Sequence, residues 1–209
     1  YPLPPGPAGL HRGKDRFADR KGSPVKIAVL GFSGAGKSTL AARLGQALDL
    51  PVLHLDRVHW LPGWVEQEKG AELEQVGRFL DTHDRWVIDG NYLSLWGERR
   101  LEEADLILLL QFSRWTCLKR VIRRQRENRG RSRPSMTQGC PEKLDREFLC
   151  WILRDGRNAA RREEYRGILT RYPQKALRFT NPRALEHWKK EWMKQRTGDA
   201  AARRPREEP

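Results

Sequence analysis

The sequence predicts a three-layer α/β fold in which helices cover both faces of a five-stranded parallel sheet. Short apolar runs alternate with amphipathic stretches of helical length, and a glycine-rich turn joins the first run to the first such stretch. The run at 106–112 is apolar except for Gln111, as is typical of a parallel strand covered on both sides. Strands that alternate with helices favour a parallel sheet. The 209 residues, 38% hydrophobic and 33% charged, suit a single domain of ordinary size.

Each element follows from its own pattern. The predicted strands span residues 25–30, 52–55, 86–88, 106–112 and 176–180. Helices are expected at residues 37–48, 66–80, 116–126, 142–169 and 183–195. In the first helix Leu40, Leu44 and Leu48 recur every fourth residue, which places them on one face. A break is expected in the long fourth helix near Asp155 and Gly156.

The two ends of the chain lack any apolar period. Residues 1–23 are rich in proline and glycine and then in charge, and residues 197–209 are polar, so we expect a disordered leader and tail around a domain at 24–196. No apolar run approaches the roughly 18 to 20 residues that a membrane span needs. Three cysteines without a C-x-x-C pair argue against a disulfide framework and a structural zinc site. These features predict a cytoplasmic protein with no membrane partner.

The net charge of +14 is unevenly distributed along the chain. Residues 1–111 carry 14 basic and 15 acidic side chains, whereas residues 112–209 carry 27 and 12. Nine of the basic side chains, mostly arginine, lie between Arg114 and Arg133. Arginine suits phosphate because its planar fork matches two oxygens at once. The charge therefore favours a polyanionic partner, and the alternative is a solvated helix face with a basic linker.

The turn after the first strand matches the phosphate-binding pattern G-x-x-x-x-G-K-[ST]. Its glycines allow a tight backbone whose N–H groups point at phosphate oxygens, and the following helix adds its N-terminal dipole. Lys37 is expected on the β and γ phosphates, and the Ser38 hydroxyl on Mg²⁺. The predicted ATP-binding residues are Gly31, Ser33, Gly34, Ala35, Gly36, Lys37, Ser38 and Thr39. The sequence thus predicts a P-loop NTPase fold with ATP and Mg²⁺ as ligands.

Other residues narrow the class of P-loop protein. No Asn-Lys-x-Asp motif for guanine is present, and strand 86–88 is followed by a single acid, Asp89. A small-molecule kinase fits best, with Asp89 holding a Mg²⁺-bound water or accepting a hydroxyl proton. Asp56 follows the second strand, where open α/β sheets place ligand groups. Trp60 and Trp64 are predicted to stack on an acceptor or to bury area.

Residues 125–141 have few apolar side chains and lie between two predicted helices. The segment contains glycine and many arginines, so it is predicted to be a mobile, arginine-rich helical lid over a phosphoryl-transfer site. Within and beside it, Arg131 is expected to act in catalysis and Arg133 on the acceptor. Arg99, after the third strand, is predicted to reach an acceptor-side phosphate or to lie at an exposed helix end.

Five stretches, taken together, resemble a known family. They are GFSGAGKSTLAARLG, LDRVHWLPGW, RWVIDGNY, ADLILLLQFSRWTCLKRVIRR and RGRSRPSMTQGCPEKLDREFL. They are similar to the adenylate-kinase-like P-loop family whose bacterial members are often labelled DNA topology modulation proteins. The similarity covers residues 25–190 in order.

This resemblance implies a nucleoside-monophosphate-kinase-type fold with ATP and Mg²⁺. It aligns Asp89-Gly90 with the D-G of the kinases' D-G-x-P-R motif, whereas Asn91-Tyr92 departs from that motif's Pro-Arg. The departure weakens the case for an ordinary nucleoside monophosphate and makes Asn91 a candidate acceptor residue. By the same resemblance, Arg120 and Arg124 stand where such kinases clamp adenine and phosphates.

Three functions remain open from the sequence. The first is a phosphotransferase that moves the ATP γ-phosphoryl group to a small acceptor. The second is a nucleic-acid-binding protein with ATP as a switch, whose arginines contact the phosphate backbone. The third is a nucleotide sensor without an acceptor. The identity of the acceptor and the oligomeric state stay open.

Overall fold

The structure is a computed structural model that describes residues 25–127, 132–142 and 144–201. The chain divides into two units. One unit comprises residues 24–187 and contains the sheet and the site, and the described part of the other is the helical stretch that begins at Trp188. In that second unit, the rings of Trp188 and Trp192 stack with centroids 5.4 Å apart. The predicted leader lies outside the described residues.

The first unit is built on five parallel strands, as predicted. They are β1 (Lys26–Gly31), β2 (Val52–His54), β5 (Trp86–Asp89), β6 (Leu106–Leu110) and β7 (Ala176–Phe179). Their order across the sheet is β2-β5-β1-β6-β7. A short antiparallel hairpin, β3 (Trp60–Leu61) with β4 (Val65–Glu66), stands apart from this sheet.

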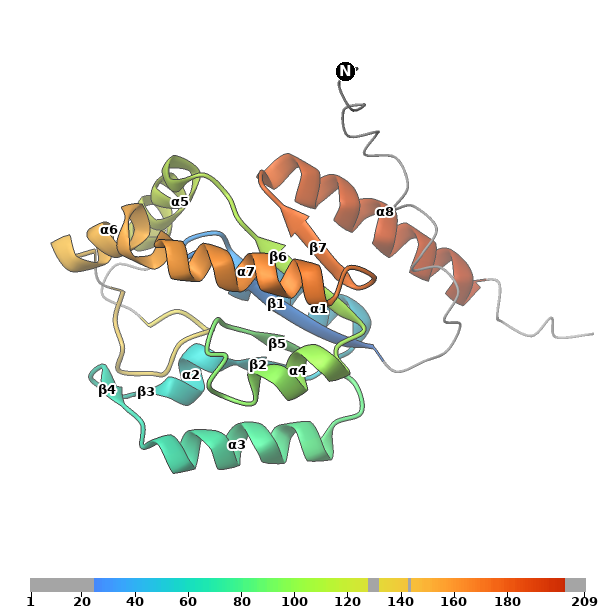
Figure 1. The fold of residues 1–209 in the computed structure, drawn as a ribbon, viewed down its shortest axis with the longest axis horizontal. Coiled ribbons are helices and arrows are strands. Elements are labelled where there is room, and N and C mark those ends of the chain that lie inside the picture. The colour runs from blue at the N-terminus through green and yellow to red at the C-terminus, as the bar shows by residue number, and fades with distance from the viewer. Residues whose placement is uncertain (1–24, 128–131, 143, 202–209) are drawn as a thin grey trace, which may run out of the picture. The chain divides into compact units, whose positions relative to one another are not determined.

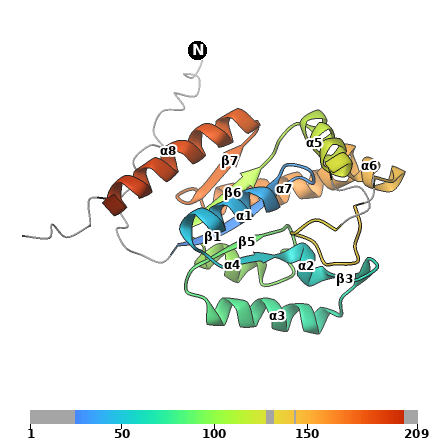
Figure 2. The ribbon, with the colours of Figure 1, turned by 180° about the vertical axis from the view of Figure 1, so that it is seen from behind.

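Helices cover both faces of the sheet, which gives three layers (Figure 1). The helices are α1 (Lys37–Leu48), α2 (Leu55–His59), α3 (Lys69–Thr82), α4 (Gly97–Glu103), α5 (Arg114–Glu127), α6 (Arg146–Leu153), α7 (Ala159–Arg171) and α8 (Pro182–Ala201). Helix α1 packs on one face, and α4 and α7 lie on the other, as the view from behind also shows (Figure 2). The predicted fold class is therefore confirmed.

The core explains why the strand sequences are so apolar. In β1 the side chains of Ile27, Ala28, Val29 and Leu30 are fully buried, and all five residues of β6 are buried. At about 25 cal/mol per Å² of apolar surface, this burial is the main force that holds the helices on the sheet. The described residues contain no helix long and apolar enough to cross a membrane.

Several predicted boundaries were wrong for local reasons. Strand β2 ends at His54 because Leu55 begins the short helix α2, and Leu55 and Val58 are fully buried one turn apart. Helix α3 begins at Lys69 rather than at residue 66. The Glu68 carboxylate caps it by accepting hydrogen bonds from the backbone N–H groups of Gly70 and Ala71, each 2.8 Å long.

Differences are larger after residue 127. The expected helix at 142–169 begins at Arg146, after the N-cap Asp145, and its predicted break is confirmed by a 3₁₀ turn at Asp155–Arg157. Of the predicted helical lid at 125–141, residues 125–127 belong to the end of α5, whereas residues 132–141 form turns instead of a helix. Pro134 and Gly139, the latter with φ of 84°, disfavour a helix there. Helix α8 spans Pro182–Ala201 and so continues beyond the predicted helix end at residue 195.

Strand order decides which chain segments meet at the site. Strand β1 lies between β5 and β6, and Asp89 at the end of β5 pairs with Val29 of β1 and His54 of β2. The carboxyl ends of these strands therefore form one edge, where the phosphate loop and Asp89 come together.

Candidate functional site

The phosphate loop connects β1 to α1, as the sequence predicted. Gly31, Gly34 and Gly36 have φ of 143°, 78° and 92°, which side chains rarely allow. At Gly31 a Cβ would also come within 2.2 Å of the Leu110 carbonyl oxygen, so no other residue fits against β6. Helix α1 begins directly after Gly36, so its first N–H groups face the space in front of the loop.

Asn91 holds the first residue of the loop in place. Its Nδ2 donates to the Gly31 carbonyl over 2.8 Å, and its Oδ1 accepts from the Gly31 N–H over 3.0 Å. The Tyr165 hydroxyl also donates to this Oδ1 over 3.1 Å. Asn91 was predicted to bind the acceptor, and the structure instead uses its amide to fix Gly31, which makes it a positioning residue.

Ser38 at the start of α1 contacts Asp89, which is buried at the end of β5 and also contacts His54 at the end of β2. The Ser38 hydroxyl donates to Asp89 Oδ2 over 2.7 Å, and Asp89 Oδ1 contacts His54 Nδ1. Asp89 is 3% exposed. The pairing of a phosphate-loop serine with an acid at the end of a neighbouring strand is the arrangement that holds Mg²⁺ in P-loop proteins.

Lys37 extends into the space that the loop encloses. Its Nζ donates to the Phe32 carbonyl over 3.4 Å. Burial lowers the pKa of the Lys37 amine below its ordinary value of 10.5, and the carboxylates of Asp56 and Asp89 oppose that shift more weakly. The buried ammonium gains a strong partner when an anion enters the loop, because phosphate oxygens replace the lost water.

A cavity of about 780 Å³ opens in front of the loop. Three parts of the chain supply most of its lining, and Tyr92, Arg124, α6 and Asp155 supply the rest. The phosphate loop and α1 contribute Ser33, Gly34, Gly36, Lys37, Ser38 and Thr39. The segment after β2 contributes Asp56, Trp60, Trp64 and Glu66, and the segment between α5 and α6 contributes Arg133, Ser135, Met136, Glu142 and Asp145. Its size suits a nucleotide and a small second ligand.

Asp56 lies in the part of the cavity wall that the segment after β2 forms. Its Oδ1 accepts from the Tyr92 hydroxyl over 3.2 Å, and its Oδ2 pairs with Arg133 Nη2 over 3.0 Å. Burial and the Asp56 charge raise the pKa of the Tyr92 phenol, so this hydroxyl stays a donor at neutral pH. Trp60 and Trp64 complete the wall, with ring centroids 5.5 Å apart and planes at 70°.

Glu142 joins the two cavity arginines on the other side. Its Oε2 accepts from Arg124 Nη2 over 3.0 Å, and its Oε1 lies 3.5 Å from Arg133 Nε. The Glu142 side chain is 7% exposed. Burial and the neighbouring Arg133 charge lower the pKa of the Arg124 guanidinium, and Glu142 opposes this. The carboxylate thus holds two like charges together at the cavity.

The described part of the predicted lid is fixed to the β3–β4 hairpin. Thr137 Oγ1 donates to the Trp60 carbonyl over 2.5 Å, and the Cys140 thiol lies 3.2 Å from the Leu61 carbonyl. The Gly63 N–H donates to the Gly139 carbonyl over 3.0 Å. This docking brings Arg133 to Asp56.

Besides Arg124 and Arg133, which line the cavity, three other arginines were predicted as site residues. Arg99 is not a cavity residue, because it pairs with Asp81 and Glu103 at 2.7 and 2.6 Å on the outside of α3 and α4. Arg120 lies against the loop, where a Cβ on Gly36 would come within 2.6 Å of its Nη2. Arg131 lies outside the described residues.

Sequence reasoning missed four site residues. They are His54, Tyr92, Glu142 and Trp151, whose indole N–H donates to the Ser33 hydroxyl over 3.0 Å. The position of His54 as the last residue of β2, beside Asp89 in register, was a usable signal. No sequence pattern pointed to Glu142 or Trp151, since their partners are remote in the chain.

Comparison with known proteins gives one relative in sequence and several likenesses in structure. No family model matches the chain. The uncharacterized protein YqaC of Bacillus subtilis (strain 168) is 27% identical over 126 residues, which cover 60% of this chain and 69% of that protein.

Solved structures similar to the chain include two kinases. A shikimate kinase from Bacteroides thetaiotaomicron is 18% identical with a TM-score of 0.45, and 85% of this chain and 98% of that one are covered. A gluconokinase from Sinorhizobium meliloti 1021 is 19% identical with a TM-score of 0.40, and 77% of this chain and 86% of that one are covered. By its own phosphate loop, its strand order and the serine–aspartate pair beside the loop, the chain has a P-loop, kinase-like α/β fold.

Proposed function

We propose that this protein is an ATP-dependent phosphotransferase that transfers the γ-phosphoryl group to a small hydroxylated acceptor. One observation carries the proposal. The phosphate loop with Lys37 opens into the same cavity as Asp56, two tryptophans and the arginine pair bridged by Glu142. A nucleotide-binding switch needs the loop, whereas a second polar wall opposite Lys37 is what a phosphoryl acceptor requires.

The residues present fit Mg²⁺. Ser38 Oγ and Asp89 Oδ2 are hard oxygen donors 2.7 Å apart at the start of α1. Mg²⁺ keeps several waters and takes few protein ligands, so a pair of oxygens is enough. This also agrees with the lack, among the described residues, of any cluster of three or more His, Cys, Asp or Glu side chains suited to a metal. Bound there, Mg²⁺ would neutralise charge on the β and γ phosphates.

The protein side chains supply position and charge. In the proposed reaction, loop N–H groups and Lys37 would hold the phosphates, and Arg124 and Arg133, which line the same cavity, would neutralise charge that develops on the transferred group. Asp56 lines the cavity and is 30% exposed at its side chain, so it is placed to accept a hydroxyl proton or hydrogen bond from an acceptor. Asp89 does not line the cavity, and its two carboxylate oxygens contact Ser38 and His54. We therefore assign contact with the acceptor hydroxyl to Asp56 and not to Asp89.

The side chains around Asp56 indicate the chemical class of acceptor that the cavity would bind. The aromatic faces of Trp60 and Trp64 favour a flat or apolar body, while Asp56 and Tyr92 favour a hydroxyl at one end. A supply of ATP and the three free cysteines favour the cytoplasm as its location.

The test is an ATP-consumption screen over nucleosides, nucleotides and small hydroxylated metabolites in the presence of Mg²⁺. We expect turnover with at least one acceptor class, its loss in Lys37→Ala, and its retention in the exposed control Lys119→Ala. Asp56→Asn is expected to lower kcat for that acceptor while ATP affinity stays the same. ATP binding without turnover for any acceptor would contradict the proposal and favour a sensor.

A further inference from the structure

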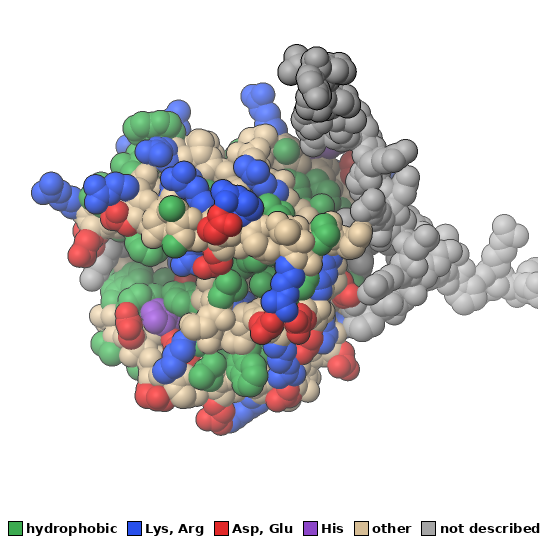
Figure 3. Space-filling model, in the orientation of Figure 1, with side chains coloured by type: hydrophobic (Ala, Val, Ile, Leu, Met, Phe, Trp, Pro, Cys, Tyr) green, Lys and Arg blue, Asp and Glu red, His purple; other side chains and the backbone are tan. Residues whose placement is uncertain are grey.

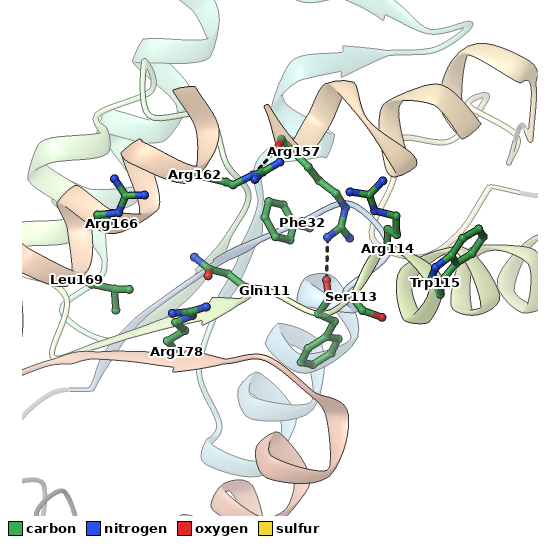
Figure 4. A pocket seen from close by; sticks show the side chains of 11 residues that line it. Phe32, Gln111, Ser113, Arg114, Trp115, Arg157, Arg162, Arg166, Leu169 and Arg178 are labelled. Carbon is green, nitrogen blue, oxygen red and sulfur yellow. Dashed lines mark hydrogen bonds between the residues drawn. The ribbon is translucent and has the colours of Figure 1, made fainter. Parts of the chain in front are cut away.

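A second cavity of about 530 Å³ lies behind the phosphate loop, between α7, the ends of β6 and β7, and the start of α5 (Figure 4). Its lining contains no Asp or Glu but five arginines, which are Arg114, Arg157, Arg162, Arg166 and Arg178. Gln111 and Ser113 add neutral hydrogen-bonding groups. Figure 3 shows that basic side chains gather over α5, α6 and α7 on the face drawn there.

Arg157 differs from its neighbours because it is buried. It is only 7% exposed, and its guanidinium stacks on the Phe32 ring at 4.1 Å from the centroid. Nε donates to the Ile152 carbonyl and Nη1 to the Phe112 carbonyl, each over 2.8 Å. Nη2 is buried and has no hydrogen-bond partner among the described residues.

A buried guanidinium without a carboxylate partner is costly, because two carbonyl dipoles, the Phe32 ring and the neighbouring Cys117 thiol offset its lost hydration without any opposite charge. The surrounding charges add to this cost rather than offset it. Within the described residues the only carboxylate recorded on a cavity arginine is Glu163, which binds Arg166 on an exposed turn of α7. Arg162 Nε donates to the Arg157 backbone carbonyl over 2.8 Å, which fixes the Arg162 side chain at the cavity wall.

We propose that this cavity binds a small phosphate-bearing molecule, at a site separate from the phosphate loop. Five arginines that line one cavity with no Asp or Glu in the lining fit a phosphate group, which accepts several hydrogen bonds from guanidinium groups at once. The depth of Arg157 argues for a small ligand, since a guanidinium 7% exposed is out of reach of a nucleic-acid backbone that runs over the surface. The volume falls within the range of ligand pockets.

Phe32 connects this site to the phosphate loop. It is the residue after Gly31, its ring carries the Arg157 stack on one side, and its carbonyl accepts from Lys37 Nζ. Because Phe32 also lines the cavity, a ligand bound there would lie beside the first residues of the loop. The site accounts for part of the arginine surplus of α7 that the ATP cavity does not use.

The test measures pyrophosphate binding to the full chain by calorimetry. In Lys37→Ala, where the loop site is weakened, we expect one remaining pyrophosphate site. Adding Arg178→Gln or Arg162→Gln should weaken that site about tenfold each, or about 1.4 kcal/mol. Both residues are exposed, so the fold is expected to survive. Arg123→Gln, 81% exposed and outside both cavities, is the matched charge control and should change nothing.

The outcomes separate a built site from a basic surface. The proposal is overturned if the single variant Lys37→Ala no longer binds pyrophosphate. It is also overturned if Arg123→Gln weakens the remaining site as much as Arg178→Gln or Arg162→Gln does. A single-stranded oligonucleotide that binds more tightly than pyrophosphate, and that Arg123→Gln weakens equally, overturns it in favour of nucleic acid. None of these results depends on phosphoryl transfer, so the proposed function stands or falls separately.

Discussion

The Ser38 hydroxyl donates a hydrogen bond of 2.7 Å to Asp89 Oδ2 across 51 residues of sequence. Strand order creates this contact, because β5 is the immediate neighbour of β1 and ends beside the start of α1. The contact connects the phosphate loop to the only acid at the end of β5, and His54 holds the second oxygen of that acid. We expect this group to decide metal dependence.

Asp89→Asn should therefore sharply lower phosphoryl transfer while it preserves the size and shape of the side chain. The amide lacks the charge that Mg²⁺ and His54 both use, so we expect kcat to fall about a hundredfold or more and the Mg²⁺ requirement to rise. Initial rates over a Mg²⁺ titration measure this. Asp81→Asn, which breaks a surface pair with Arg99, is the control and should leave both parameters unchanged. A variant at position 89 with the rate and Mg²⁺ dependence of the original protein would refute the metal role.

Glu142→Gln should lower stability because it leaves Arg124 and Arg133 close together without the carboxylate between them. We expect a loss of about 1–3 kcal/mol, since Arg133 keeps Asp56 as a partner. Chemical denaturation measures it. The matched control is Glu163→Gln, which breaks an arginine pair in solvent and should cost about 0–1 kcal/mol. Equal losses in the two variants would show that burial of the bridge contributes nothing.

Gly36→Ala should weaken ATP binding through the backbone. At φ of 92° an alanine is strained, and its Cβ would displace the Arg120 guanidinium. We expect ATP affinity to fall about tenfold, which is about 1.4 kcal/mol. The control is Gly167→Ala in α7, where no atom lies within 4 Å of the added Cβ. That change should stabilise the protein by about 0.5–1 kcal/mol and leave ATP binding intact. Both effects are read by calorimetry and thermal unfolding.

The lowered pKa of Lys37 predicts a pH dependence of ATP binding. The protonated amine attracts phosphate, and burial lowers its pKa below 10.5, so the charge is lost at a lower pH than for an exposed lysine. ATP affinity should therefore fall as pH rises through that lowered pKa. Lys37→Arg should abolish the decline, because a guanidinium stays protonated there. A decline of equal size in Lys37→Arg would assign it to another group.

The phosphate loop and the strands could be predicted because their signals are local. The spacing of Gly31, Gly36, Lys37 and Ser38 and the apolar runs of β1 and β6 each lie within a few residues, where backbone freedom and burial act directly. The helical lid was predicted from composition, which records the arginines of residues 125–141 but not the turns that residues 132–141 form.

Candidate residues outside the loop fall into two groups, those that line the cavity and those whose polar groups are bound elsewhere. Asp56, Trp60, Trp64, Arg124 and Arg133 lie at the cavity as the sequence suggested. Asn91 and Arg99 do not, because Gly31 in one case and Asp81 with Glu103 in the other occupy their polar groups. The type of a residue and its position at a strand end do not show which of several polar groups it binds in the folded protein.

The sequence by itself determined the sheet, the phosphate loop and the excess of arginine in the second half of the chain. The tertiary structure decided how those arginines are used. Arg133 meets Asp56 over 77 residues, while Arg157 is buried against Phe32 beside a second cavity. The physical reason is that propensity and periodicity act over single elements, whereas charge pairing depends on which elements the fold packs together.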